Sequence, residues 1–173
     1  MQRVIIAVLV LAASFSCEEV DKLLTFSVNN EVTIQIPAST VIDLPVGIPT
    51  PDVTTNSDQT FQNNNTRASL VKDVKLQEMK LTITAPTGKT FSFLKSIYIY
   101  ISTGQNDELL LASLEDVPAN VNNITLKPTG EKLDPYVKAS SYKLRTSIIT
   151  DETLTQNVDV KANLRFKVTA APL

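Results

Sequence analysis

The stretch VDVKANLRFKV, residues 158–168, is the most regular pattern in the chain. Apolar residues occupy every second position, and polar or charged residues lie between them. This period of two is that of a β-strand with one buried face and one solvated face. At about 3.3 Å per residue the stretch extends roughly 36 Å, which is long for a globular protein. It predicts a long strand that faces a core.

Similar alternation recurs through most of the chain. In residues 31–36 and 142–148, apolar and polar positions alternate, and residues 141–150 are predicted to form a C-terminal hairpin with 158–168, closed by the polar loop 151–157. Residues 91–102 predict a central strand with Phe91, Phe93 and three isoleucines on one face. In residues 73–84 the apolar face changes parity between Leu76 and Met79, which predicts a bulge.

Helix signals are few. A single helical turn is predicted at 133–138, with Asp134 as its cap and Pro135 in its first position. Residues 37–51 are rich in proline and are expected to be extended or at a sheet edge. The Asn- and Thr-rich segment near 54–66 is expected to be a mobile loop. The pattern predicts an all-β protein, an antiparallel, immunoglobulin-like β-sandwich of about seven to nine strands in one domain over 23–173.

Two segments of the predicted sandwich resemble a known family of domains. They are LTITAPTGKTFSFLKSIYIYIS (81–102) and ELLLAS (108–113). Their layout is similar to that of the late-embryogenesis-abundant, water-stress type of β-sandwich domain, over about residues 70–169. The resemblance implies a fold and does not by itself give a function.

The N-terminal region carries a different signal. One arginine, Arg3, precedes a run from Val4 to Phe15 without charged residues, which is typical of a signal peptide and too short to span a bilayer as a helix. An ordinary secretory signal cut after Ser14 would leave Cys17, the single cysteine of the chain, as an exposed thiol prone to oxidation.

Acylation of that thiol is the other interpretation. The sequence Ser14-Phe15-Ser16-Cys17 resembles a bacterial lipobox of the kind found in Bacteroidetes lipoproteins, and Glu18, Glu19 and Asp21 resemble the acidic signal that sends some of them to the cell surface. The resemblance implies a signal peptide over 1–16, a lipidated tether over 17–22, and attachment to the membrane through acylated Cys17. The expected location is the bacterial outer membrane, facing either the periplasm or the cell surface.

Composition excludes most catalytic chemistry. The chain has no histidine and no tryptophan, and its formal net charge is −2. The usual neutral-pH base, the common nucleophilic triads and the common zinc sites are therefore absent from the sequence, and nothing in it attracts nucleic acid. No cofactor and no metal site are predicted. Acidic pairs stand at 107–108, 115–116 and 151–152, where a glycosidase pair is conceivable but solvated turns are expected.

Tyr98 and Tyr100 lie on the strand face opposite the isoleucines. They form either a stacking platform for a glycan or protein, or ordinary packing between strands. The favoured function is a non-enzymatic, lipid-anchored envelope lipoprotein that acts as a surface binding or structural module, with an unknown protein, glycan or lipid as its ligand. The alternative is a periplasmic carrier of a lipid or other apolar ligand between the sheets, with the apolar segment 41–48 as a lid.

Overall fold

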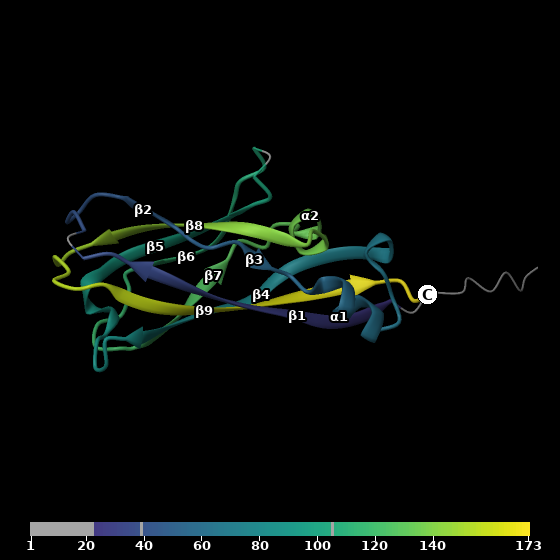
Figure 1. Ribbon diagram of the computed structural model, residues 1–173, viewed down its shortest axis with the longest axis horizontal. Coiled ribbons are helices and arrows are strands. Elements are labelled where there is room, and N and C mark those ends of the chain that lie inside the picture. Colours follow the sequence, from purple (N-terminus) through teal and green to yellow (C-terminus); the bar gives the residue numbers. More distant parts are fainter. Residues whose placement is uncertain (1–22, 39, 105) are drawn as a thin grey trace, which may run out of the picture.

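The computed structural model describes residues 23–38, 40–104 and 106–173. The predicted signal peptide and tether, with Cys17, Glu18, Glu19 and Asp21, lie outside the described residues. Within them the protein is an all-β protein with short helical segments (Figure 1). Its strands are β1 (Leu24–Ile36), β2 (Val46–Pro49), β3 (Val53–Thr54), β4 (Val71–Ala85), β5 (Leu94–Ser102), β6 (Leu109–Glu115), β7 (Asn123–Pro128), β8 (Ser141–Thr150) and β9 (Val158–Ala170).

The nine strands of the described residues form one continuous antiparallel sheet in the order β1-β9-β4-β7-β6-β5-β8-β2, with β3 pairing to β8. The sheet curls over on itself, so that β1, β9 and β4 face β6, β5, β8 and β2 (Figure 1). β7 makes the link, because its first part pairs with β4 and its last residues pair with β6. The result is sandwich-like, as the sequence predicts.

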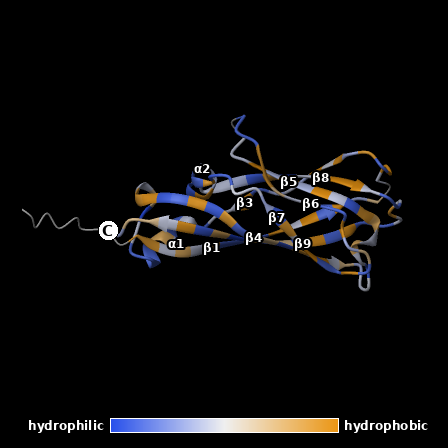
Figure 2. Ribbon diagram, turned by 180° about the vertical axis from the view of Figure 1, so that it is seen from behind, coloured by the Kyte–Doolittle hydropathy of each residue, from blue (hydrophilic) through white to orange (hydrophobic). Residues whose placement is uncertain are grey.

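β9 lies in the middle of the first layer. It pairs with β1 along 13 consecutive residues and with β4 on its other side. All its inward-facing side chains, from Val158 to Ala170, are at most 2% exposed. Figure 2 shows the matching alternation of hydrophobic and hydrophilic residues along the strands. The long strand predicted from 158–168 is confirmed.

The predicted C-terminal hairpin is wrong. β8 pairs with β5 and β2, whereas β9 pairs with β1 and β4. The loop 151–157 therefore crosses from one layer to the other. Alternation says that each strand has one buried face, but it does not say whether two strands lie side by side or face each other across a core. Here the ring of Tyr142 in β8 packs edge-on against Phe166 in β9, with ring centroids 6.1 Å apart.

The predicted bulge in β4 is confirmed. The register against β9 shifts between Leu76 and Glu78, so Gln77 is the extra residue. Leu76 and Met79 are both buried on the two sides of the shift. The bulge resolves the change of parity and keeps both halves of the strand facing the core.

The predicted strand over 91–102 needs a correction at its start. Phe91–Phe93 forms a short 3-10 turn, and β5 begins at Leu94. The Phe91 backbone N–H donates to Val121 O at 2.8 Å, outside the strand ladder. Both phenylalanines are nevertheless fully buried. The sequence therefore identified these core positions correctly but predicted the wrong backbone conformation for them.

The segment expected to be a mobile loop near 54–66 contains the helix α1 (Ser57–Asn63). Its polar sequence conceals one apolar anchor, Phe61, which is fully buried and packs edge-on against Phe26 of β1 at 6.1 Å. Burial of one large side chain fixes a turn of helix that composition alone does not predict. The predicted helical turn exists as α2 (Asp134–Lys138), but Leu133 holds the N-cap position and Asp134 begins the helix.

Candidate functional site

Tyr98 and Tyr100 project from the outer face of β5, as the sequence predicts, and each is half-buried. Their cross-strand neighbours on β8 are Ser147 and Arg145. The core lies on the opposite face of β5, where Ile97, Ile99 and Ile101 are buried, so the two tyrosines are on its solvent side. Their surroundings differ, however, and this difference decides which one can contact a ligand.

Tyr100 is occupied on one face of its ring. The Arg145 guanidinium lies 4.0 Å from the ring centroid, within the range of a cation–π contact. Arg145 also donates twice to Glu108, from Nε to Oε2 at 2.9 Å and from Nη2 to Oε1 at 2.6 Å. These hydrogen bonds hold the pKa of Glu108 below its usual value. The bidentate pair fixes Arg145 over Tyr100, so Tyr100 is a poor stacking platform on that side.

Tyr98 is held by a carboxylate instead. Its hydroxyl donates to Glu115 Oε1 at 2.9 Å, and this hydrogen bond is the largest cause of the raised pKa of Tyr98. Glu115 is on the neighbouring strand β6, directly opposite Ser96. The Tyr98 ring thus lies next to the carboxylate of Glu115 on the outer face of the sheet.

An open depression of about 440 Å³ lies beside Tyr98. We call it the distal recess; it is lined by Asp43, Lys95, Ser96, Tyr98, Glu115, Asp116 and Ile149. The lining comes from β5, β6, β8 and the segment that precedes β2. Distant parts of the sequence therefore build one polar site with an aromatic wall.

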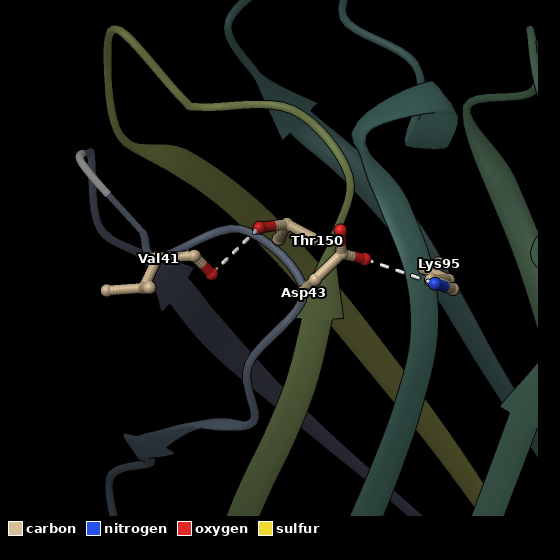
Figure 3. Close-up of polar contacts among 4 residues, drawn as sticks. All are labelled: Val41, Asp43, Lys95 and Thr150. Carbon is tan, nitrogen blue, oxygen red and sulfur yellow. Dashed lines mark hydrogen bonds and ion pairs between the residues drawn. The ribbon is translucent and has the colours of Figure 1, made fainter.

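The segment 40–44 contributes Asp43 to the lining of the distal recess. Figure 3 shows the polar contacts of this segment with Thr150 and Lys95. The Asp43 backbone N–H donates to Thr150 O at 2.8 Å, and Thr150 Oγ1 donates to Val41 O at 3.4 Å. The Asp43 carboxylate then reaches Lys95 Nζ at 3.1 Å. Backbone hydrogen bonds to the end of β8 therefore position Asp43 at the rim.

The same segment carries exposed apolar side chains: Val41, Ile42 and Leu44 are 54%, 42% and 57% exposed. The sequence marked 41–48 as a lid over a cavity between the sheets. The structure divides it: the residues up to Leu44 are exposed, whereas Val46–Pro49 forms β2 and pairs with β8. Ile48 alone of this run is fully within the core, at 3% exposed.

Two of the three acidic pairs, 107–108 and 115–116, contain side chains with local partners. Asp107 accepts hydrogen bonds from the Thr103 backbone N–H at 2.9 Å and from Thr103 Oγ1 at 2.8 Å, which ties the turn before β6. Glu108 and Glu115 are held by Arg145 and Tyr98. Within the described ranges, no group of three or more acidic or cysteine side chains is placed to hold a metal ion. Likewise, none of the described helices is long and apolar enough to cross a membrane.

Sequence analysis found Tyr98 and considered Glu115 but missed Asp43, Lys95 and Ser96. Local sequence could not have identified Asp43, because it joins the site only through the return of segment 40–44 to the end of β8. Lys95 and Ser96 are on the same strand as Tyr98, but only the pairing of β5 with β6 places Ser96 beside Glu115. The parity of β5 places Ser96 on the face of Tyr98, and that is the one signal present in the sequence.

No protein-family model matches the chain, and no curated protein matches it. Among solved structures, the fold is similar to the BFDV capsid protein of a 60-mer, at 9% identity and a TM-score of 0.47 over 88% of this chain and 95% of that one. It is also similar to FLHE, at 7% identity and a TM-score of 0.35 over 85% of this chain and 97% of that one. A third likeness, to Desmodium yellow mottle tymovirus, has 12% identity and a TM-score of 0.31 over 87% and 90%. These likenesses are too distant to bear on function.

Proposed function

We propose that the protein is a non-enzymatic, lipid-anchored lipoprotein of the bacterial outer membrane, with an immunoglobulin-like domain that presents a binding face away from the membrane. The observation that carries the proposal is the opposite placement of two features. β1 begins with Leu24, beside the C-terminal end of β9, and runs the length of the layer (Figure 1). The distal recess lies near the other end, where segment 40–44 follows β1 and meets Thr150.

The distance between these two ends of the domain determines how far the distal recess would lie from the membrane. A strand of the length of β1 extends about 43 Å at about 3.3 Å per residue. The tether 17–22 adds at most about 20 Å when fully extended. A domain held by Cys17 would then project its distal recess several nanometres from the lipid surface, where a soluble or surface-bound partner can reach it.

The composition and the contacts of the acidic side chains support a role without enzymatic activity. The chain has no histidine. Of its acidic pairs, Glu108 is engaged by Arg145, and Glu115 is engaged by Tyr98. A binding role, unlike acid–base catalysis, does not require Glu108 or Glu115 to leave these hydrogen bonds.

The carrier alternative finds no specific support in the described residues. Large aromatic side chains, Phe91, Phe93, Tyr142 and Phe166, fill the space between the layers, and each is at most 1% exposed. A ligand between the sheets would have to displace them. Extraction of the purified protein with organic solvent tests this: recovery of a stoichiometric lipid would favour the carrier.

The experiment for the proposed function is digestion of intact cells with a protease, followed by detection of the protein in membrane and soluble fractions. The wild type is expected in the membrane fraction and to be digested from outside. Cys17→Ala is expected to move the protein to the soluble fraction. A wild-type protein that is soluble, or a Cys17→Ala variant that stays in the membrane, would contradict the lipid anchor. A membrane-bound but protected protein would contradict surface display and place the domain in the periplasm.

A further inference from the structure

The charges around the distal recess are unbalanced. Three carboxylates, those of Asp43, Glu115 and Asp116, line it against the single ammonium of Lys95. The Tyr98 ring and the apolar side chain of Ile149 complete the lining. Negative charge beside an aromatic face favours a cation, because a ring attracts positive charge and carboxylates accept its hydrogen bonds.

Ser96 provides an independent observation at the floor of the distal recess. It lies on the outward face of β5, between the cross-strand neighbours Glu115 and Ile149. Its neighbours nevertheless leave it only 6% exposed, and its hydroxyl makes no hydrogen bond of ordinary geometry within the described part of the chain. Its interaction with Tyr98 is weak: it lowers the pKa of Tyr98 only against the larger raising effect of Glu115. A buried hydroxyl without a partner is costly, and a ligand with a hydrogen-bond donor would satisfy it.

Apolar side chains next to Asp43 add to this surface, although none of them lines the distal recess itself. Ile42 and Leu44, the chain neighbours of Asp43, are 42% and 57% exposed. The side chain of Val41 is also exposed but points away from the Asp43–Lys95 ion pair (Figure 3). Several exposed large apolar residues on one short segment mark an interaction surface more often than isolated ones do. A small cation would use the distal recess but leave Ile42 and Leu44 in water, whereas a polypeptide can cover both the recess and these two side chains.

We propose that the distal recess binds a lysine or arginine side chain of a partner protein, while apolar residues next to that side chain pack on Ile42 and Leu44. The cation would donate to Glu115 and Asp43 and to the Ser96 hydroxyl, with the Tyr98 ring along its side. The inference rests on the proposed function only in taking the distal end as the displayed one.

Lys95 acts as an internal competitor in this arrangement. Its ion pair with Asp43 is 3.1 Å long, and the two side chains are 59% and 64% exposed. An exposed pair of this kind contributes little stability and is easily replaced by another cation. Removal of the Lys95 charge should therefore strengthen binding, a gain that loss of folding cannot imitate.

The test uses the full chain, purified in detergent from whole cells, and a fluorescein-labelled peptide of sequence Leu-Lys-Leu with blocked ends. Binding is followed by fluorescence anisotropy at low salt. Glu115→Gln and Asp43→Asn are each expected to weaken binding about tenfold, and Lys95→Gln to strengthen it several-fold. Glu131→Gln is the matched control: this exposed carboxylate lies between β7 and α2, outside the distal recess, and its loss should leave affinity unchanged.

Three results would overturn the inference. The first is equal binding of a control peptide, Leu-Glu-Leu, with the same label and blocked ends. The second is an effect of Glu131→Gln as large as that of Glu115→Gln. The third is binding of spermidine or glucosamine without binding of the lysine peptide, which would leave a cation site but remove the protein partner. Each is distinct from failure of the proposed function, because a soluble protein in the fractionation experiment would remove the anchor and leave peptide binding intact.

Discussion

The Tyr142 hydroxyl donates a hydrogen bond to Asn30 Oδ1 across the interior, at 3.2 Å. This contact joins β8 of one layer to β1 of the other, and both residues are buried. Asn30 continues the link, because its Nδ2 donates to the Thr55 carbonyl oxygen at 3.1 Å, between β3 and α1. These buried hydrogen bonds therefore join the two layers at the edge between β1 and β3, where the described residues form no backbone ladder from one layer to the other.

The Tyr142→Phe substitution is expected to lower the free energy of unfolding by about 1–3 kcal/mol, because it leaves the buried Asn30 Oδ1 without its donor. Urea denaturation followed by circular dichroism measures the change. Tyr98→Phe is the matched control: its hydroxyl contacts the exposed Glu115, so a change within about 0.5 kcal/mol is expected. Equal effects of the two substitutions would show that the buried hydrogen bond from Tyr142 adds no stability.

Alkaline pH should weaken the fold through the same residue. Burial raises the pKa of Tyr142 well above its usual value, so the unfolded chain loses this proton first as pH rises. The associated stability is fully present below about pH 10 and falls above it, by up to about 1.4 kcal/mol per pH unit. The difference in unfolding free energy between wild type and Tyr142→Phe should therefore shrink above pH 10. A constant difference from pH 8 to pH 11 would contradict the prediction.

Arg145→Gln is expected to raise the pKa of Glu108 toward its ordinary value of 4.5, because the hydrogen bonds from Arg145 are the largest cause of its depression. The carboxyl carbon shift of Glu108, followed by NMR during an acid titration, measures it. A depressed pKa contributes stability that is present above the ordinary value and lost as pH falls through the folded one. Since the pair is exposed, that contribution should stay below about 1 kcal/mol.

Lys143→Gln is the control for that titration, because Lys143 lies two residues before Arg145 on β8 and on the same face of the strand. It removes an exposed positive charge that does not contact Glu108, so the pKa of Glu108 should hardly move. An equal shift in both variants would assign the depression to general charge and not to the bidentate contact.

Two single-residue deletions in β4 test its bulge. Removal of Gln77 restores regular alternation between Leu76 and Met79, so the protein should fold with some loss of stability. Removal of Lys80, also exposed, should prevent folding, because it turns Leu81 and the residues after it away from the core. Thermal unfolding by circular dichroism distinguishes the two. A folded Lys80 deletion beside an unfolded Gln77 deletion would refute this account of the bulge.

The sequence by itself determined which residues face the core. Alternation around the pleat depends only on local backbone geometry, so it identified β9, the inward isoleucines of β5 and the bulge in β4. It failed where a buried position is polar. Asn30 interrupts the apolar face of β1, and the predicted strand therefore began at residue 31 although β1 begins at Leu24.

Tertiary structure alone decided which strands are neighbours and what surrounds each side chain. β8 and β9 both have strand patterns, but only the path of loop 151–157 places them in opposite layers. Phe61 anchors a helix in a polar segment because the core offers it a place beside Phe26. The distal recess has the same origin: Asp43, Ser96 and Glu115 are distant in the chain, and strand pairing, which acts through space, brings them together.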